Sequence, residues 1–492
     1  MVVQHNMQAM NANRMLNVTT STQAKATEKL SSGYKINRAA DDAAGLTISE
    51  KMRKQIKGLD RASTNAEDGV SSVQTAEGAL TEVHSMLQRM NELAVQASNG
   101  TNSESDRSAI QDEIDQLTTE IDRVSETTKF NETYLLKGED GTKTINMKAH
   151  DAGLAGTLVD NGNGTATFKM DALNAGDKVS IGGKTYTIGV EAADVTAMLG
   201  DKGADIAKNH NDVTVNGTTY KWYDKIDANA TGTGYKGTAA GWYAKDPSTL
   251  DNKTAATTAD FAGVAAFAAK KGATISVGAK SVTTIDDTKA DGIDDNDNTI
   301  ITKQKAYELA GKELLAANGI GDTEGNATVK NGDGSALAYN AGDGSFKITV
   351  GQAKVANALS FSLHVGADAD MTNKIQVDIE SMSAAGLGIK GLNVKDDSGK
   401  AATYAIDSIA DAVAKVSSQR SALGAVQNRL EHTIANVDNV VENTTSAESR
   451  IRDTDMAETM VEYSKNNILA QAGQSMLAQA NQSNQGVLSL LQ

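Results

Sequence analysis

The 492-residue chain contains no cysteine and a single proline, Pro247. The absence of cysteine fits either a cytosolic protein or a protein that is exported unfolded by a route that forms no disulfides. Aromatic residues make up 4% of the chain and hydrophobic residues 39%. Because large apolar side chains are so few, seams between helices built from Ala, Val and Leu suit this composition better than a compact core. We therefore expect several domains whose stability depends on helix length and on contacts with other subunits.

Other absences exclude whole classes of protein. No run of about eighteen or more apolar residues is present, so the sequence predicts no membrane insertion. The N-terminus lacks the apolar segment of a cleaved secretory signal, and none is expected. A net charge of −16 argues against nucleic-acid binding. Residues 1–58 carry nine Lys or Arg against four Asp or Glu, which we interpret as a solvated helix face, with an anion-binding arm as the alternative.

The chain is organised around a long heptad pattern from Ile48 to Ala97. Steps of four and three residues meet a polar side chain only at Gln55. Such a repeat keeps one narrow stripe facing a partner helix, which is typical of a coiled coil, and the helix would be on the order of 75 Å long. The positions of this seam are Ile48, Met52, Gln55, Leu59, Ala62, Ala66, Gly69, Val73, Ala76, Leu80, Val83, Leu87, Met90, Ala94 and Ala97.

A second seam of the same kind runs from Ile406 to Val441, with two polar interruptions. Because the two seams are far apart in the chain and the material between them differs in character, we expect them to pair as a rod from which the intervening segment projects. Ser103 and Asp106 resemble a capping box that starts another helix. We expect that helix to return along the first one through Ile110, Ile114, Leu117, Ile121 and Val124.

The two ends of the chain carry weaker helical patterns. The heptad step continues through residues 1–30 with small or polar side chains, at Ala9, Ala12, Leu16, Thr19, Gln23, Ala26 and Leu30. Such a helix buries too little to offset its ordering entropy, so we expect it to be frayed in the monomer and ordered by neighbours. Residues 449–492 are also predicted to be helical. Residues spaced four apart form a row along this helix, at Ile468, Ala472, Met476 and Ala480. The segment closes on an apolar tip, which implies a partner, at Val487, Leu488, Leu490 and Leu491.

The middle of the chain, from Gly138 to about Leu359, is rich in Gly, Thr, Asp and Asn. Val179–Ile188 alternates around Gly182-Gly183, which predicts a tight β-hairpin. We also expect two short helices, near Phe261–Ala269 and Lys305–Ala317, and a second β segment at Ser360–Val394. The predicted fold class is α+β multidomain, a long α-helical coiled-coil rod from paired N- and C-terminal segments with a mainly β inserted variable domain.

The usual signatures of catalysis are missing, so we predict a protein that is not an enzyme and has no cofactor and no metal site. No H-E-x-x-H motif occurs among the six histidines. Gly182–Thr185 ends like a P-loop, but Lys178 stands where the first glycine belongs. Gly386–Gly391 matches G-x-G-x-x-G without a βαβ unit around it. The acidic run Asp291–Asn298 lacks the features of an EF-hand loop, so we interpret it as a solvated loop, with weak Ca²⁺ binding as the alternative.

Short motifs at both ends of the chain resemble those of bacterial flagellins. At the N-terminal end they are Leu30–Gly33, Ile36-Asn37, Asp41–Gly45, Asn65–Gly69 and Gln74–Leu80. At the C-terminal end they are Leu423–Leu430, Asp453–Ala457 and Val487–Leu491. The resemblance covers roughly residues 1–140 and 360–492 and leaves the middle of the chain uncovered.

The resemblance implies a structural subunit of the bacterial flagellar filament, secreted and extracellular, exported unfolded and assembled at the filament tip. Its implied partners are other copies of the chain, the flagellar export machinery, a flagellin chaperone and the filament cap. Five domains are implied. Residues 1–44 form an N-terminal inner-tube helix with a connector, and residues 45–145 form the outer-tube rod helices. Residues 146–358 form a surface-exposed variable domain, residues 359–447 a β-element with the C-terminal rod helix, and residues 448–492 a C-terminal inner-tube helix. Polymerisation contacts are expected at Met7, Met10, Leu16, Leu30, Ile468, Leu469, Met476, Leu488, Leu490 and Leu491.

A further implication is recognition by the host Toll-like receptor 5. Gln88–Gln96 resembles the patch by which flagellins bind this receptor, and Glu113 matches an acidic contact from the neighbouring helix. Gln88 belongs to this patch by resemblance, and the heptad seam leaves Arg89, Glu92, Leu93 and Gln96 at or beside the outer face. The alternative interpretation is a surface ion pair between Arg89 and Glu92 with lateral packing of Leu93, and the same patch could make filament contacts.

Two other classes of protein share rod helices and a variable insert. One is a flagellar hook-filament junction protein, which assembles in few copies. The other is a secreted coiled-coil adhesin. The length of the polymer that the purified chain forms distinguishes these alternatives from a filament subunit.

Overall fold

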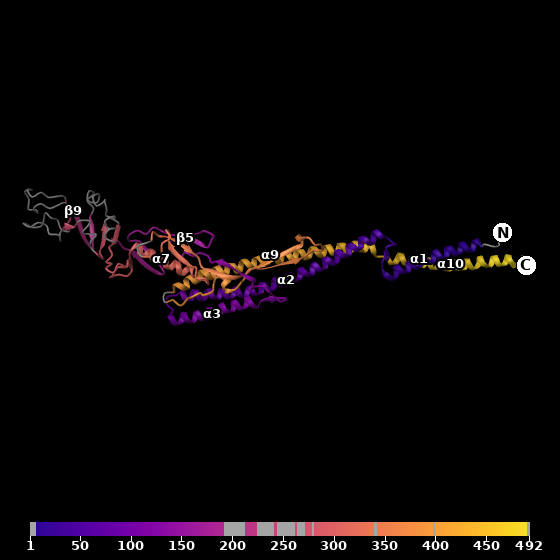
Figure 1. Cartoon of the computed structure of the whole chain (residues 1–492), viewed down its shortest axis with the longest axis horizontal. Coiled ribbons are helices and arrows are strands. Elements are labelled where there is room, and N and C mark those ends of the chain that lie inside the picture. The colour runs from indigo at the N-terminus through magenta and orange to yellow at the C-terminus, as the bar shows by residue number, and fades with distance from the viewer. Residues whose placement is uncertain are drawn as a thin grey trace, which may run out of the picture. The chain divides into compact units, whose positions relative to one another are not determined.

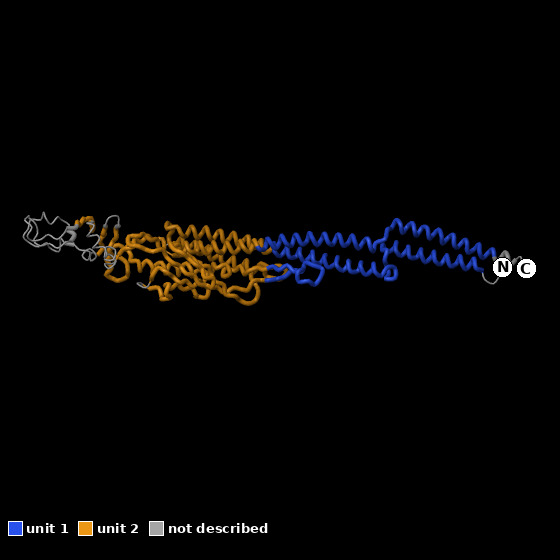
Figure 2. Tube along the Cα trace, turned by 90° about the horizontal axis from the view of Figure 1, so that it is seen from above, with its two compact units in different colours: residues 1–74, 360–377, 422–492 blue, residues 75–359, 378–421 orange. Residues whose placement is uncertain are grey.

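The computed structural model describes residues 6–190, 212–223, 241–243, 261–262, 271–277, 280–338, 342–396 and 399–489. The chain forms two compact units, each of which combines segments that lie far apart in the sequence (Figure 2). Unit 1 comprises residues 1–74, 360–377 and 422–492, and unit 2 comprises residues 75–359 and 378–421. The predicted fold class is confirmed, because helical terminal regions flank a β-rich middle.

In unit 1, helices α1 (Met7–Ser32) and α10 (Met456–Ser489) lie side by side and run antiparallel (Figure 1). The Asn6 side chain caps α1 by accepting from the Ala9 N–H (3.0 Å), and its Nδ2 donates to the Ala480 carbonyl of α10 (3.1 Å). All seven predicted seam positions of α1 are buried or half-buried, which confirms the heptad. The buried or half-buried positions that recur at the same step on α10 are Thr459, Tyr463, Asn466, Ala470, Gly473, Leu477 and Ala480.

The i+4 row of α10 diverges from this seam. Ile468 is 67% exposed and Met476 is 61% exposed, so the row faces α1 only where it reaches Ala480. Four residues turn an α-helix by more than one full turn, so an i+4 row winds around the helix, whereas alternating steps of four and three follow one line.

The rest of unit 1 contains parts of α2 (Ala43–Ser98) and α9 (Lys400–Arg452) and a small sheet. The sheet is the predicted second β segment, in which β18 (Leu359–His364) pairs with β19 (Lys374–Ile379) after the short 3₁₀-helix η1 (Met371–Asn373). The His364 carbonyl accepts from Asn65 Nδ2 of α2 (2.9 Å). The sheet packs on both long helices through a buried apolar cluster formed by Ala66, Val365, Ile375 and Leu430.

The beginning of the α2 seam differs from the prediction. Ile48 is 45% exposed and Gln55 is also exposed, whereas Gly45 and Ser49 are buried. The helix begins against the connector that follows α1, where a Cβ added to Gly45 would lie 2.8 Å from the Ile36 side chain. The buried stripe at this end is therefore displaced around the helix by about one residue relative to the predicted heptad.

In unit 2, α3 (Glu104–Thr127) packs with α2 as the predicted helical hairpin. The predicted capping box is confirmed, since the Ser103 side chain accepts from the Asp106 N–H and the Asp106 carboxylate accepts from the Ser103 N–H. Arg107 Nε, on a buried side chain, donates to the Ala97 carbonyl at the end of α2 (3.1 Å). The predicted seams of both helices are buried or half-buried in unit 2: Leu117 and Val124 are half-buried, and the buried positions include Leu80, Val83, Leu87, Met90, Ile110, Ile114 and Ile121.

The core of the inserted region is a four-stranded sheet covered by α7 (Lys303–Asn318). The rings of Phe168 and Phe346, on neighbouring strands, stack with centroids 6.3 Å apart. The sheet has the order β15-β16-β5-β4, with bounds Thr328–Asn331, Ser345–Thr349, Thr165–Met170 and Gly156–Asp160. Helix α7 confirms the helix predicted near Lys305–Ala317.

The predicted hairpin at Gly182-Gly183 is confirmed. Strands β6 (Lys178–Ile181) and β7 (Lys184–Ile188) pair antiparallel, and both glycines have positive φ (56° and 73°), as a two-residue turn of this hand requires. Strand β14 (Ile300–Ile301) adds to β7 in parallel. Two further pairs are β1 (Lys129–Phe130) with β2 (Thr133–Tyr134), and β3 (Glu139–Asn146) with β17 (Gln352–Asn357).

A six-stranded antiparallel sheet lies further along the insert. Its order is β11-β10-β9-β8-β12-β13, with bounds Phe261–Ala262, Gly241–Tyr243, Thr218–Tyr223, Val213–Val215, Thr274–Val277 and Lys280–Thr283. The helix predicted from Phe261 is wrong at its first two residues, because they pair as a strand with Trp242 and Tyr243. The remainder of that prediction lies outside the described residues.

Candidate functional site

The sequence motifs that resembled ligand sites are ordinary structural features of unit 2. Gly182–Thr185 forms the turn and first residues of a β-hairpin. Gly386–Gly391 comprises the last two residues of the one-turn helix α8 (Ala384–Leu387) and the turn after it, where Gly388 and Gly391 take positive φ. Across the described ranges, no three His, Asp or Glu side chains are grouped as a metal ion would need. No helix in the described part of the chain has the length and apolar character that crossing a bilayer requires.

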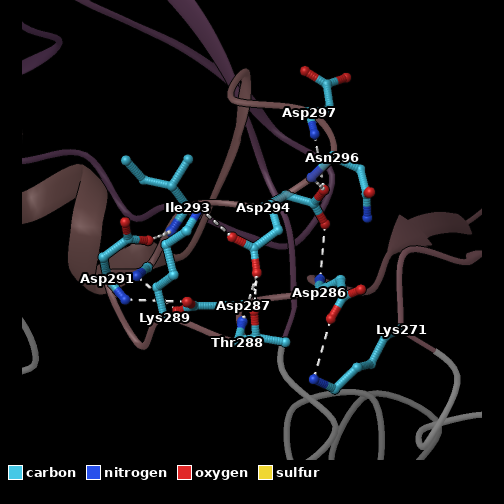
Figure 3. Close-up of polar contacts among 12 residues, drawn as sticks. Lys271, Asp286, Asp287, Thr288, Lys289, Asp291, Ile293, Asp294, Asn296 and Asp297 are labelled. Carbon is cyan, nitrogen blue, oxygen red and sulfur yellow. Dashed lines mark hydrogen bonds and ion pairs between the residues drawn. The ribbon is translucent and has the colours of Figure 1, made fainter.

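The acidic run is a loop closed by its own carboxylates (Figure 3). The buried Asp294 carboxylate accepts from the N–H groups of Asn296 and Asp297 (both 2.9 Å) and of Asp286 (2.8 Å). Lys289 Nζ pairs with Asp295 at 2.6 Å, and this contact holds the pKa of the Asp295 carboxyl well below its usual range. These carboxylate oxygens therefore accept hydrogen bonds from backbone amides or pair with a lysine. The loop is stabilised by its own side chains.

The residues predicted for polymerisation gather on α1 and α10. Leu16 and Leu30 lie half-buried in the α1–α10 seam. The side chain of Leu488 and all of Leu490 and Leu491 lie outside the described residues. The other predicted residues are exposed apolar side chains of the two helices, namely Met7, Met10, Ile468, Leu469 and Met476.

The structure adds exposed apolar residues that the sequence analysis missed. They alternate with the seam positions on the same two helices and include Met15, Val18, Met456, Met460 and Val461. A second apolar row outside the assigned heptad is the signal that could have found them, because a helix with a single partner has no need of it. We name the exposed apolar residues of α1 and α10 together the terminal apolar rows.

A groove of about 870 Å³ runs between α1 and α10. Small residues, among them Ala472 and Gly473, are part of its lining. Three exposed apolar side chains, Met15, Leu469 and Met476, stand along it. Exposed apolar surface of this extent on a pair of helices marks a surface that another protein covers.

The residues of the predicted receptor patch come together across α2 and α3 in unit 2. Arg89 Nε donates to Glu113 Oε1 (2.8 Å) and Arg89 Nη1 to Glu92 Oε2 (3.2 Å). The contact with Glu113, followed by that with Glu92, raises the pKa of Arg89. Gln88 and Gln96 are exposed on α2 beside this cluster. We name Arg89, Glu92 and Glu113 the Arg89 cluster.

Leu93 does not belong to this surface. The prediction that it lies at or beside the outer face is wrong, since only 2% of Leu93 is exposed. In this part of α2 the buried residues include Met90, Leu93, Ala94 and Ala97, a stripe wider than a two-position heptad seam. A helix that packs against more than one neighbour buries such a stripe, and the Arg89–Glu113 contact places α3 on this side of α2.

Comparisons with known proteins agree with the architecture. Residues 3–140 match the bacterial flagellin N-terminal helical region, and residues 406–491 match the bacterial flagellin C-terminal helical region. A flagellin of Clostridium tyrobutyricum is 37% identical, over 99% of this chain and 100% of its own length. A flagellin of Salmonella typhimurium is 36% identical over 97% of this chain and 96% of its own length, and one of Halalkalibacterium halodurans is 32% identical over 100% of both. The chain therefore belongs to the bacterial flagellins, a family of structural proteins that form the extracellular flagellar filament.

Proposed function

We propose that the chain polymerises through the terminal apolar rows of α1 and α10. The observation that carries the proposal is that each helix buries one face against the other and leaves a second set of apolar side chains in solvent. Fully burying one Ile, Leu or Met side chain stabilises a complex by roughly 1.5–3 kcal/mol. Several such residues on each helix are enough to drive association of copies that touch along their ends.

Assembly of this kind orders the subunit as it binds. In α1 only Ala26 is buried, so the pair gains little stability from its own seam. Neighbours that bind only the ordered pair shift the equilibrium towards it. Because a surface on one helix meets a different surface on the next copy, the contacts do not close on themselves and extend as a helical filament.

Export in an unfolded state fits the same features. The chain has no cysteine to oxidise outside the cell. A free α10 would expose Val461, Ile468 and Met476 before assembly, so we assign a chaperone to this helix during export and a cap to the growing end of the filament. Under this proposal the flagellar export machinery delivers the chain to its extracellular site.

Seeded polymerisation tests the proposal. Purified chain is added to sheared fragments of its own filaments, and growth is followed by electron microscopy and light scattering. Ile468→Asp places a charge in an apolar row and should slow growth roughly tenfold or more, since the burial it removes is worth at least about 1.4 kcal/mol. Gln474→Asp, at an exposed polar position of the same helix, should leave growth within about twofold.

Three results would count against polymerisation through these rows. One is equal growth of the Ile468→Asp and Gln474→Asp variants. Another is a product that stops at a few copies, which would favour a hook-filament junction protein. The third is a monomer that never grows on seeds, which would favour an adhesin.

The Arg89 cluster supports a second activity, binding to Toll-like receptor 5. The cluster is exposed and joins two helices by a charge-assisted pair, so it offers a fixed pattern of charge to a partner. Arg89→Asp should weaken receptor binding at least about tenfold. Arg123→Asp breaks a comparable exposed pair with Glu120 on α3 and serves as the control. Equal affinity of the two variants in a surface-plasmon measurement would end this assignment.

A further inference from the structure

The contacts between α1 and α10 fix the register of the pair. Leu16 Cδ1 lies 3.3 Å from the point that a Cβ on Gly473 would occupy, so Leu16 fills the space that the glycine leaves. In an antiparallel pair, one heptad forward along α1 corresponds to one heptad back along α10. Leu16 and Gly473 therefore define a layer, and Gln23 with Asn466 form the equivalent layer one heptad further on.

Several layers of this seam pair a large residue with a small one, whereas the Ala9–Ala480 and Thr19–Ala470 layers each hold two small residues. The layer beside Leu16–Gly473 places Ala12 against Leu477, and the layer beyond Gln23–Asn466 places Ala26 against Tyr463. The burial agrees with this assignment, since Ala26 is the buried residue of α1 and its layer holds the one aromatic ring of the seam. Close packing of helices depends on such alternation, because two large residues overpack a layer and two small ones leave a void.

A slip by one heptad would destroy this fit. With α10 displaced by seven residues, Thr19 would meet Tyr463, Ala12 would meet Ala470, and Leu16 would cover Asn466. The first layer is overpacked and the third covers an amide with an apolar side chain. The observed register is therefore distinguished in these two layers from the register slipped in this direction.

The polar layer adds to the discrimination. Asn466 is 8% exposed, and its Nδ2 is buried with no hydrogen-bond partner among the described residues. An unpaired buried amide destabilises a seam unless the facing residue can pair with it. Gln23 is the residue in that layer with a side-chain carbonyl and enough reach to do so. A buried amide side chain at one seam position is an established way of specifying helix register.

We propose that the α1–α10 seam carries a register code, made of large-small layers and the Gln23–Asn466 polar layer, that admits one antiparallel alignment. The code positions the terminal apolar rows of the two helices relative to each other. Of its two tests, seeded polymerisation rests on the proposed function and disulfide crosslinking does not. Copies whose two helices pair in another register present mismatched rows and do not add to the polymer.

The size code is tested by exchanging the partners of one layer. Ala12→Leu overpacks against Leu477 and should slow seeded polymerisation about tenfold. Leu477→Ala leaves two alanines facing each other and should also slow it. The double variant Ala12→Leu/Leu477→Ala restores one large and one small residue and should return growth to within about twofold of the unchanged chain. Impairment of the double variant equal to the product of the two single effects contradicts the pairing.

Disulfide crosslinking reads the register directly, because the chain contains no native cysteine. The pair Thr19→Cys/Ala470→Cys lies in the observed layer, and Ala12→Cys/Ala470→Cys lies in the slipped one. Oxidation should join the first pair at least about tenfold faster than the second, since a disulfide forms only between close Cα atoms. In a chain that also carries Gln23→Leu and Asn466→Leu, the rate of disulfide formation in the slipped pair should rise towards the rate in the observed pair.

Equal crosslinking of the two cysteine pairs in the unchanged seam overturns the register code. No rise of the slipped crosslink in the Gln23→Leu/Asn466→Leu chain overturns the role of the polar layer. Both crosslinks are measured on the soluble chain as well as on the polymer. A chain that crosslinks in register but does not grow on seeds therefore refutes the proposed polymerisation and leaves the register code intact.

Discussion

The guanidinium of Arg452 lies over the ring of Tyr34, with its Cζ 4.8 Å from the ring centroid. Tyr34 follows α1 and Arg452 ends α9, so this contact joins the two breaks between long helices in unit 1. The neighbouring backbones also pair, since Tyr34 bridges to Asp453 and the Lys35 N–H donates to the Arg452 carbonyl (2.6 Å). Both connectors are therefore held at one level by a ring, a cation and a short antiparallel bridge.

Removing the Tyr34 ring should loosen this joint. Tyr34→Ala loses the cation–π contacts with Arg452 and with Arg53, whose Cζ lies 5.7 Å from the centroid. We expect a cost of about 1 kcal/mol and faster hydrogen exchange around residues 32–36 and 452–455. Tyr34→Phe keeps the ring and should exchange nearly as slowly as the unchanged chain. Identical exchange in Tyr34→Ala and the unchanged chain would show that the ring does not hold the joint.

A half-buried acid joins α7 to α9 in unit 2. Glu313 accepts from the Tyr404 hydroxyl (2.8 Å) and from Lys400 Nζ (2.7 Å). Burial, together with this hydrogen bond, raises the pKa of Tyr404. Tyr404→Phe should lower the free energy of unfolding of unit 2 by about 1 kcal/mol, and Glu313→Leu by more, because it leaves both donors without their acceptor. Chemical denaturation followed by far-UV circular dichroism measures both changes. An unaltered denaturation midpoint in Glu313→Leu would contradict the prediction.

Acid should weaken the loop around Asp322. Its carboxylate accepts four backbone N–H groups, from Glu324, Gly325, Ala327 and Gln352, at 2.7–3.1 Å. Burial raises the pKa of Asp322, but these hydrogen bonds outweigh it and the pKa is lowered from 3.8. A lowered pKa in the folded state means stability that is present above the ordinary value of 3.8 and is lost as the pH falls below it.

Asp322→Asn tests that acid dependence. The amide cannot accept four hydrogen bonds as a carboxylate does, so the variant should lose about 1–3 kcal/mol at neutral pH. Its stability should then change less than that of the unchanged chain between pH values just above and just below the ordinary carboxyl pKa. Parallel pH profiles for the two proteins, measured by thermal unfolding, would assign the acid sensitivity to other groups.

Variants at Leu93 and Arg89 should distinguish an effect on folding stability from an effect on receptor binding. Leu93 is buried, so Leu93→Ala should reduce the stability of unit 2 by about 2–5 kcal/mol. Arg89 is exposed, and Arg89→Asp should change the free energy of unfolding far less than Leu93→Ala while weakening binding. Urea unfolding of the two variants decides this, and a Leu93→Ala variant as stable as the unchanged chain would restore Leu93 to the surface.

The sequence was sufficient to predict features that depend on local periodicity. The seven seam positions of α1, the capping box at Ser103 and the Gly182-Gly183 hairpin were all predicted correctly, because heptad spacing, side-chain capping and positive φ act over a few residues. Ile48 and Leu93 were assigned to the wrong environment because burial depends on which elements lie alongside a helix. A heptad identifies the side that faces one partner, and Leu93 packs where a second neighbour covers the helix.

The candidate site was predicted in part for the same reason. Ile468 and Met476 were identified as apolar residues without an assigned partner, and they are exposed on α10. Met15 and Val18 were missed because they fall between the positions of the heptad, and only the antiparallel pairing of α1 with α10 shows that this face stays uncovered. The pairing of Arg89 with Glu113 was suggested by resemblance, since the two residues lie on different helices and no local pattern connects them.

Imaging the polymer at near-atomic resolution shows whether copies associate through the terminal apolar rows. We predict that Met10, Ile468 and Met476 lie within about 4.5 Å of side chains from neighbouring copies, with α1 and α10 of each copy antiparallel. A polymer in which these three side chains face solvent, and whose contacts between copies lie elsewhere on the chain, would contradict it.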